Sequence, residues 1–382
     1  MNQLNKIKLS EHVFFILVTL KEVIALGIPS FFLNILIGST AIFIIIRNRF
    51  VKKLDNFEYL IIFVALVYLA EAIYSERNLA LIINYVIILL LPILLYRMFA
   101  SADPKIGYIY IIFAVIVGMI QQLIGGEINK DIYIYMQREK HDVELIGHVL
   151  KDDFSLFEYR IGSLFVEPIT FGLVCAFGFI TLTKKLNFIG ILLIIGVMLS
   201  GAKSAVLVLV LYMIFSYTRL FYNGRLGFII CMAFIIITPY MIGQFAEQIN
   251  LKQGFINHLV GYKNGLESIM NNPFGSGLGS SGYLLILENQ RNGIYSELDP
   301  RGLALGNESA IGVMSYMFGF TFWILFILYM IKWGSRRFSY IKKYLLSIVP
   351  IFIITESLLS ITIIVFLTYF LTSIEKHYAF NR

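Results

Sequence analysis

Charged residues, cysteines and the common catalytic motifs are all scarce in this sequence of 382 residues. Only 14% of the residues are charged, whereas a soluble domain has about a quarter. The two cysteines, Cys175 and Cys231, each lie in an apolar run, which indicates small buried side chains rather than a disulfide or a metal pair. No HExxH, CxxC, GxxxxGK[ST] or GxSxG motif is present, so nothing points to a zinc protease, a P-loop nucleotide site or a serine hydrolase.

Apolar residues are abundant instead, at 58% of the chain. A bilayer core of roughly 30 Å needs about 20 apolar residues per helix. We therefore expect an all-α integral membrane protein, a single polytopic domain over residues 1–382 with about 12 transmembrane helices. The expected spans are about 11–28, 30–46, 57–73, 78–99, 106–125, 167–183, 186–200, 203–218, 226–246, 308–331, 343–356 and 358–373.

Basic residues gather in alternate connections between these spans. Such clusters mark cytoplasmic helix ends, so both termini are predicted to be cytoplasmic, with the first helix uncleaved. The net charge of +7 is explained by these clusters, and a nucleic-acid partner is not expected. Residues Tyr344–Ile374 are divided into two spans at Glu356, because an ionisable group is costly in mid-bilayer.

Two long connections, about 126–166 and 247–307, fall on the outer face in this topology. Loops of this length are usually functional, and we expect a substrate site there. Within them, the apolar spacing of Val143–Leu156 and of Phe255–Ile269 predicts helices that lie in the membrane interface or pack the loops onto the bundle.

Three charged residues stand at the outer ends of predicted spans: Arg160, Lys203 and Glu308. Charge near hydrocarbon is costly and usually has a role, although each of these side chains could also simply orient its helix. Two cations near one carboxylate would suit a lipid-linked pyrophosphate. His141 and His148 lie seven residues apart, but a solvated loop face is favoured over a metal site, and no metal is expected.

The order of four motifs resembles the O-antigen polymerase and ligase superfamily, bacterial membrane glycosyltransferases of the Wzy type and their ligase relatives. The resemblance covers about residues 155–330. The motifs are Arg160-x-Gly162…Glu167-Pro168…Gly172, Leu199-Ser-Gly-Ala-Lys203-Ser-Ala, Asn272-Pro-Phe-Gly-Ser-Gly-Leu-Gly279 and Asn307-Glu308…Gly312.

The resemblance implies roles for particular residues. Arg160 would bind or neutralise pyrophosphate. Lys203 stands where the family often has an arginine, and a lysine there keeps the positive charge but loses the two-pronged hydrogen bonding of a guanidinium group. Glu308 stands where ligases typically have a histidine, so it favours a polymerase, with Arg160 and Glu308 as the catalytic pair and Glu308 as general base. The expected substrate-binding residues, for pyrophosphate or glycan, are Arg160, Lys203, Arg291, Arg301, His258, Gly275 and Gly277.

The implied activity is a surface-polysaccharide polymerase, of O-antigen or capsule type, in the bacterial cytoplasmic (inner) membrane. It would transfer a glycan from undecaprenyl pyrophosphate to another lipid-linked repeat, on the outer (periplasmic) face and without a cofactor. The expected partners are lipid-linked oligosaccharides, the lipid bilayer and a chain-length regulator. Two alternatives stay open: an O-antigen ligase that transfers glycan to lipid A core, and a polysaccharide flippase, which the long loops and the lack of visible repeats disfavour.

Overall fold

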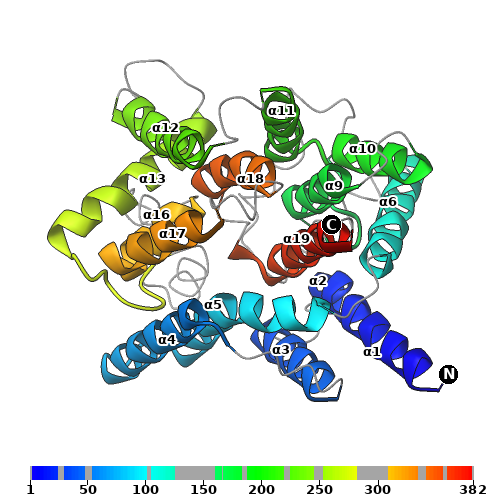
Figure 1. Cartoon of the computed structure of the whole chain (residues 1–382), viewed down its shortest axis with the longest axis horizontal. Helices are drawn as coiled ribbons and strands as arrows, with labels where there is room; N and C mark the ends of the chain where they lie inside the picture. Colours follow the sequence, from blue (N-terminus) through cyan, green and yellow to red (C-terminus); the bar gives the residue numbers. More distant parts are fainter. Residues whose placement is uncertain are drawn as a thin grey trace. The chain divides into compact units, whose positions relative to one another are not determined.

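The computed structural model confirms an all-helical chain over the residues that it describes (Figure 1). The described residues contain no strand. Among the described residues, four helices are long and apolar enough to cross a membrane: α4 (Asn56–Tyr74), α5 (Leu79–Phe99), α6 (Ile106–Ile124) and α12 (Arg225–Gln244). The total of twelve spans stays a prediction. The described residues are 2–24, 30–47, 54–100, 105–124, 160–165, 167–182, 187–218, 224–244, 253–281, 309–333, 341–355 and 359–380.

The chain divides into two compact units, each assembled from distant parts of the sequence. The first unit comprises Met1–Leu54, Leu90–Leu209 and Ser360–Arg382, and the second comprises Asp55–Leu89 and Val210–Leu359. Because both units are discontinuous, neither corresponds to a separable stretch of chain.

Aromatic packing forms the core of the first unit. The Phe15 ring stacks on Phe99 and on Tyr110 and meets the edge of Tyr369, with centroids 5.1 to 5.8 Å apart. Such ring pairs stabilise a core beyond their buried area. The helices α9 and α10 pack side by side, with α6 against α10 and α19 against α9. The helices of this unit, besides α6 and the end of α5, are α1 (Asn2–Thr19), α2 (Lys21–Ile24), α3 (Ser30–Arg47), η2 (Ser163–Phe165), α9 (Pro168–Thr181), α10 (Phe188–Ser200), the start of α11 (Lys203–Tyr217), and α19 (Ile361–Phe380).

Close helix crossings organise the second unit. A Cβ added at Gly265 of α13 would lie 2.6 Å from the Cα of Gly312 in α16, so these helices approach as only glycine allows. The buried Tyr262 hydroxyl donates to the Ile236 carbonyl of α12 at 2.9 Å. Burial raises the pKa of Tyr262, which keeps this hydroxyl a donor. The helices of this unit, besides α4, α12, the start of α5 and the end of α11, are α13 (Gln253–Asn271), α16 (Ala310–Phe318), α17 (Phe320–Trp333) and α18 (Lys342–Ile354).

Most predicted spans coincide with helices, and two are interrupted. The tenth span, about 308–331, was predicted as one helix, and this is wrong: Gly319 interrupts it and separates α16 from α17. The first span, about 11–28, is also divided, since α1 ends at Thr19 and α2 begins at Lys21. The predicted division near Glu356 is confirmed by the separate helices α18 and α19, and the predicted helix Phe255–Ile269 is confirmed as part of α13. The predicted helix Val143–Leu156 lies outside the described residues.

Candidate functional site

In the first unit, Arg160 is held against the turn that joins α10 to α11. The backbone N–H of Ile161 donates to the Leu199 carbonyl at 3.0 Å, and Arg160 Nε donates to the Ser200 carbonyl at 3.3 Å. Gly201 follows with a φ of 57°, the left-handed conformation that ends a helix most easily at glycine. The chain then enters α11 at Lys203. Two of the predicted cations are thereby brought to one turn.

The first turn of α9 packs against the same α10–α11 turn. A Cβ added at Gly172 would lie 2.9 Å from the Ala202 Cβ, so glycine is what permits the contact. Pro168 starts α9, as is common at a first helical position. The Thr170 hydroxyl donates to the Glu167 carboxylate beside it.

This end of the first unit gathers positive potential. The helices α9 and α11 both begin here, and helix N-termini carry a partial positive charge that favours anions. Of the described side chains here, the part-buried Arg160 and the exposed Lys203 are positively charged, and the Glu167 carboxylate offsets part of that charge. The arrangement suits an anionic ligand such as a diphosphate, which arginine contacts through its fork and lysine as a point charge.

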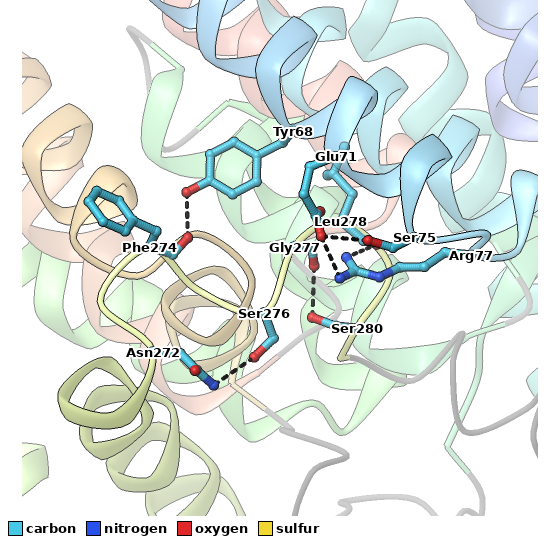
Figure 2. Close-up of polar contacts among 10 residues, drawn as sticks. All are labelled: Tyr68, Glu71, Ser75, Arg77, Asn272, Phe274, Ser276, Gly277, Leu278 and Ser280. Atoms are coloured by element: carbon cyan, nitrogen blue, oxygen red, sulfur yellow. Dashed lines mark hydrogen bonds and ion pairs between the residues drawn. The ribbon is translucent and has the colours of Figure 1, made fainter.

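In the second unit, residues 272–281, here named the glycine segment, close the C-terminal end of α16 (Figure 2). Gly275, Gly277 and Gly279 have φ values of 80°, 84° and 76°, which L side chains rarely adopt. This conformation lets the N–H groups of Ser276 and Gly277 donate to the carbonyls of Tyr316 and Met317, each at 2.9 Å. A Cβ at Gly275 would collide with this backbone, 2.5 Å from the Phe318 nitrogen.

Tyr68 of α4 completes the capping of the break between α16 and α17. Its hydroxyl lies 2.5 Å from the Phe274 carbonyl oxygen and 3.1 Å from that of Phe318. The N–H of Phe320, at the start of α17, donates to the Pro273 carbonyl at 2.8 Å. Unpaired backbone groups are costly in an apolar environment, so this pairing is what allows an apolar helix to end and restart.

The described residues of the predicted site are divided between the two units. Arg160 and Lys203 meet at one turn of the first unit, whereas Gly275 and Gly277 belong to the second unit. The Gly277 N–H is already paired with α16, so the conformation of this glycine is explained by helix capping, and contact with a ligand stays a prediction.

His258 is half-buried on α13 in the second unit. Arg291, Arg301 and Glu308 lie outside the described residues. Among the described residues, no group of three His, Cys, Asp or Glu side chains could hold a metal ion.

Sequence reasoning missed Tyr68, Glu71 and Arg77. The Arg77 guanidinium forms an ion pair with Glu71 at 2.8 Å and also donates to the Leu278 carbonyl (Figure 2). The sequence did show a lone arginine between two predicted spans on the outer face. Its partner on the glycine segment could not be predicted, because it is a backbone oxygen, which every residue type has.

Comparisons with known proteins identify no family for this chain. No protein-family model, curated protein or solved structure matches it. What the chain does is therefore inferred from its own residues.

Proposed function

We propose that the chain is a bacterial surface-polysaccharide polymerase that transfers a glycan from undecaprenyl pyrophosphate to another lipid-linked repeat. The observation that carries this proposal is the hydrogen bond from Arg160 Nε to the Ser200 carbonyl, which joins Arg160 to the turn that leads into Lys203. Two cationic side chains and two helix N-termini would then bind one anionic group of the substrate.

The proposed reaction requires little covalent chemistry from the protein. A hydroxyl oxygen of the acceptor sugar attacks the anomeric carbon of the donor, and the bond from that carbon to the phosphate oxygen breaks. The hydroxyl proton goes to a base, for which Glu308 is the predicted group. The pyrophosphate leaves on its lipid carrier, and Arg160 and Lys203 stabilise its charge.

The proposed setting follows from the apolar helices and the positive-inside rule. The chain would lie in the cytoplasmic membrane with both termini in the cytoplasm and the Arg160 turn facing outward. The energy of transfer comes from the lipid pyrophosphate, so no nucleotide is needed on that side. The proposed partners are the lipid-linked donor and acceptor and a chain-length regulator.

The decisive experiment uses purified protein in lipid nanodiscs with the lipid-linked repeat extracted from a strain that lacks this chain. Wild type should yield a ladder of longer glycans, and Arg160→Ala should yield none at the same protein level. Arg225→Ala is the control, because Arg225 is exposed at the start of α12, on the predicted cytoplasmic side. A full ladder from Arg160→Ala refutes the role of Arg160.

The same purified protein separates the alternatives. In nanodiscs supplied with lipid A core, transfer of finished glycan to that acceptor without chain growth identifies a ligase. In sealed vesicles, movement of the lipid-linked repeat across the membrane without chain growth identifies a flippase. Either result overturns the polymerase proposal.

A further inference from the structure

One face of α6 lies along the segment that begins at Arg160. The Ser163 hydroxyl donates to the Ala114 carbonyl of α6. One turn later in α6, a Cβ added at Gly118 would lie 3.4 Å from Ile161 Cγ2. The chain from residue 163 back to residue 161 therefore follows α6 toward its C-terminal end, and Arg160 comes next in that direction.

Gln122 follows Gly118 by one more turn of α6. Residues four apart lie on the same face of a helix, about 6 Å apart along its axis. Arg160 in turn lies about 3.8 Å from Ile161, measured between their Cα atoms. Both steps lead from the contact between Gly118 and Ile161 toward the same end of the first unit. Gln122 therefore lies at the end of α6 that borders the Arg160 turn.

The Gln122 amide is placed unfavourably for a residue with only a structural role. The side chain is half-buried, and its Oε1 atom is buried with no hydrogen-bond partner among the described residues. Burial of an amide without a partner is costly, and the hydrocarbon of a membrane offers no water to compensate. An unpaired polar group of this kind calls for a partner that binds there, such as a ligand or a water molecule.

The chemistry of an amide matches a sugar better than a diphosphate. An amide both donates and accepts, and its terminal torsion is broad, so either end can turn toward a ligand. A sugar hydroxyl has the same double capacity. An ionised diphosphate only accepts, and it is matched by Arg160, Lys203 and the two helix N-termini. A neutral amide at the border of this cationic turn therefore suits the sugar that carries the diphosphate.

We propose that Gln122 binds a hydroxyl group of the sugar next to the pyrophosphate and so extends the Arg160 turn into a glycan-binding site. This inference rests on the proposed function. The hydroxyl donates to the amide oxygen, which pairs the buried Oε1 atom. In the proposed reaction the anomeric carbon of this sugar is attacked, so a contact with the sugar also orients the reacting carbon.

The chain offers a matched control in the second unit. Ser216 Oγ, near the end of α11, is also buried with no partner among the described residues, and it lies on the predicted cytoplasmic side. Gln122→Met and Ser216→Ala each remove an unpaired polar atom and leave an apolar side chain. In a detergent titration followed by tryptophan fluorescence, both variants should be at least as stable as wild type, because neither loses a hydrogen bond among the described residues. A clear loss of stability in Gln122→Met alone would show a structural role and overturn the inference.

The test measures the Kd of two radiolabelled lipids for purified protein in nanodiscs. One is the lipid-linked repeat, and the other is undecaprenyl pyrophosphate without a sugar. Gln122→Met should weaken binding of the lipid-linked repeat about three- to tenfold, the effect of one lost hydrogen bond, and leave binding of undecaprenyl pyrophosphate unchanged. Ser216→Ala should match wild type with both lipids.

The other results overturn the inference. Equal weakening with both lipids would show that Gln122 contacts the pyrophosphate, and unchanged binding of both would show that only water meets its amide. Wild type without affinity for the lipid-linked repeat also overturns it.

The two lipids also separate this inference from the proposed function. Arg160→Ala should weaken binding of both lipids, because it removes a contact with the pyrophosphate that they share. If wild type binds the lipid-linked repeat but forms no polymer, the proposed function fails. The difference between the two lipids in Gln122→Met still decides whether Gln122 binds the sugar.

Discussion

Gly319, at the break between α16 and α17, is the position where one added methyl group should do most harm. Its φ of 54° and ψ of −135° belong to a region that is essentially restricted to glycine. A Cβ there would lie 2.6 Å from the Gly275 nitrogen and closer still to the Pro273 carbonyl oxygen. Because both obstacles are backbone, no side-chain rotation can relieve the contact.

The cost of Gly319→Ala has two parts. The strained backbone conformation costs about 1–3 kcal/mol in a residue other than glycine. The glycine segment must also retreat by at least about 0.8 Å to bring the 2.6 Å contact to an ordinary 3.4 Å, and further to clear the Pro273 carbonyl oxygen. That shift weakens the bond from the Phe320 N–H to the Pro273 carbonyl, which contributes about 1 kcal/mol. We expect the free energy of unfolding to fall by about 2–4 kcal/mol.

Unfolding of purified protein in mixed micelles, followed by tryptophan fluorescence during a detergent titration, measures this change. Gly38→Ala is the matched control, because a Cβ at Gly38 in α3 would meet nothing within 4 Å. Alanine should be neutral or slightly stabilising there, since glycine in a helix costs about 0.5–1 kcal/mol relative to alanine. Equal unfolding curves for the two variants would refute the account of the α16–α17 break.

Three further predictions concern the same unit. Tyr68→Phe should lower stability by about 1–3 kcal/mol in the same titration, because the Phe274 carbonyl loses its hydroxyl partner. Gly265→Ala should lower stability by about 1–3 kcal/mol, because the added methyl forces α13 away from Gly312 of α16. Asn272→Cys, in a background without native cysteines, should react with a membrane-impermeant maleimide added outside whole cells, since its side chain is exposed and the topology places it outward.

Each of these variants has a matched control. Tyr59→Phe removes a hydroxyl from an α4 tyrosine that is 57% exposed and should change little. Gly224→Ala adds a methyl group where nothing lies within 4 Å. Arg225→Cys, on the predicted cytoplasmic side, should react only after permeabilisation. If Tyr68→Phe or Gly265→Ala is as stable as its control, the corresponding contact is unimportant for stability. External labelling of Arg225→Cys would show that the topology is the opposite of the predicted one.

Helix positions could be predicted because the apolar runs have membrane length and polar ends. The span expected at about 106–125 is the helix Ile106–Ile124, and that expected at about 57–73 is Asn56–Tyr74. The break at Gly319 could not be predicted, because apolar residues stand on both sides of it. Its cause is a backbone partner at Pro273, far away along the chain.

Only the charged residues of the candidate site could be predicted from the sequence. Arg160 and Lys203 stood out because each borders an apolar run, and the structure brings Arg160 to the turn that leads into Lys203. Arg77 was passed over as a site residue because its contact with the glycine segment is the Leu278 carbonyl. Any residue type can supply a carbonyl, so no pattern of residue types shows such a partner.

The order in which the capping groups occur along the chain has a consequence for biogenesis. Tyr68 and Pro273 both precede Gly319 in the sequence, so a ribosome delivers them before the helix that they close. When α17 emerges, the groups that pair with the C-terminal end of α16 and with the N-terminal end of α17 have already been synthesised. The break at Gly319 can therefore be capped without a later part of the chain.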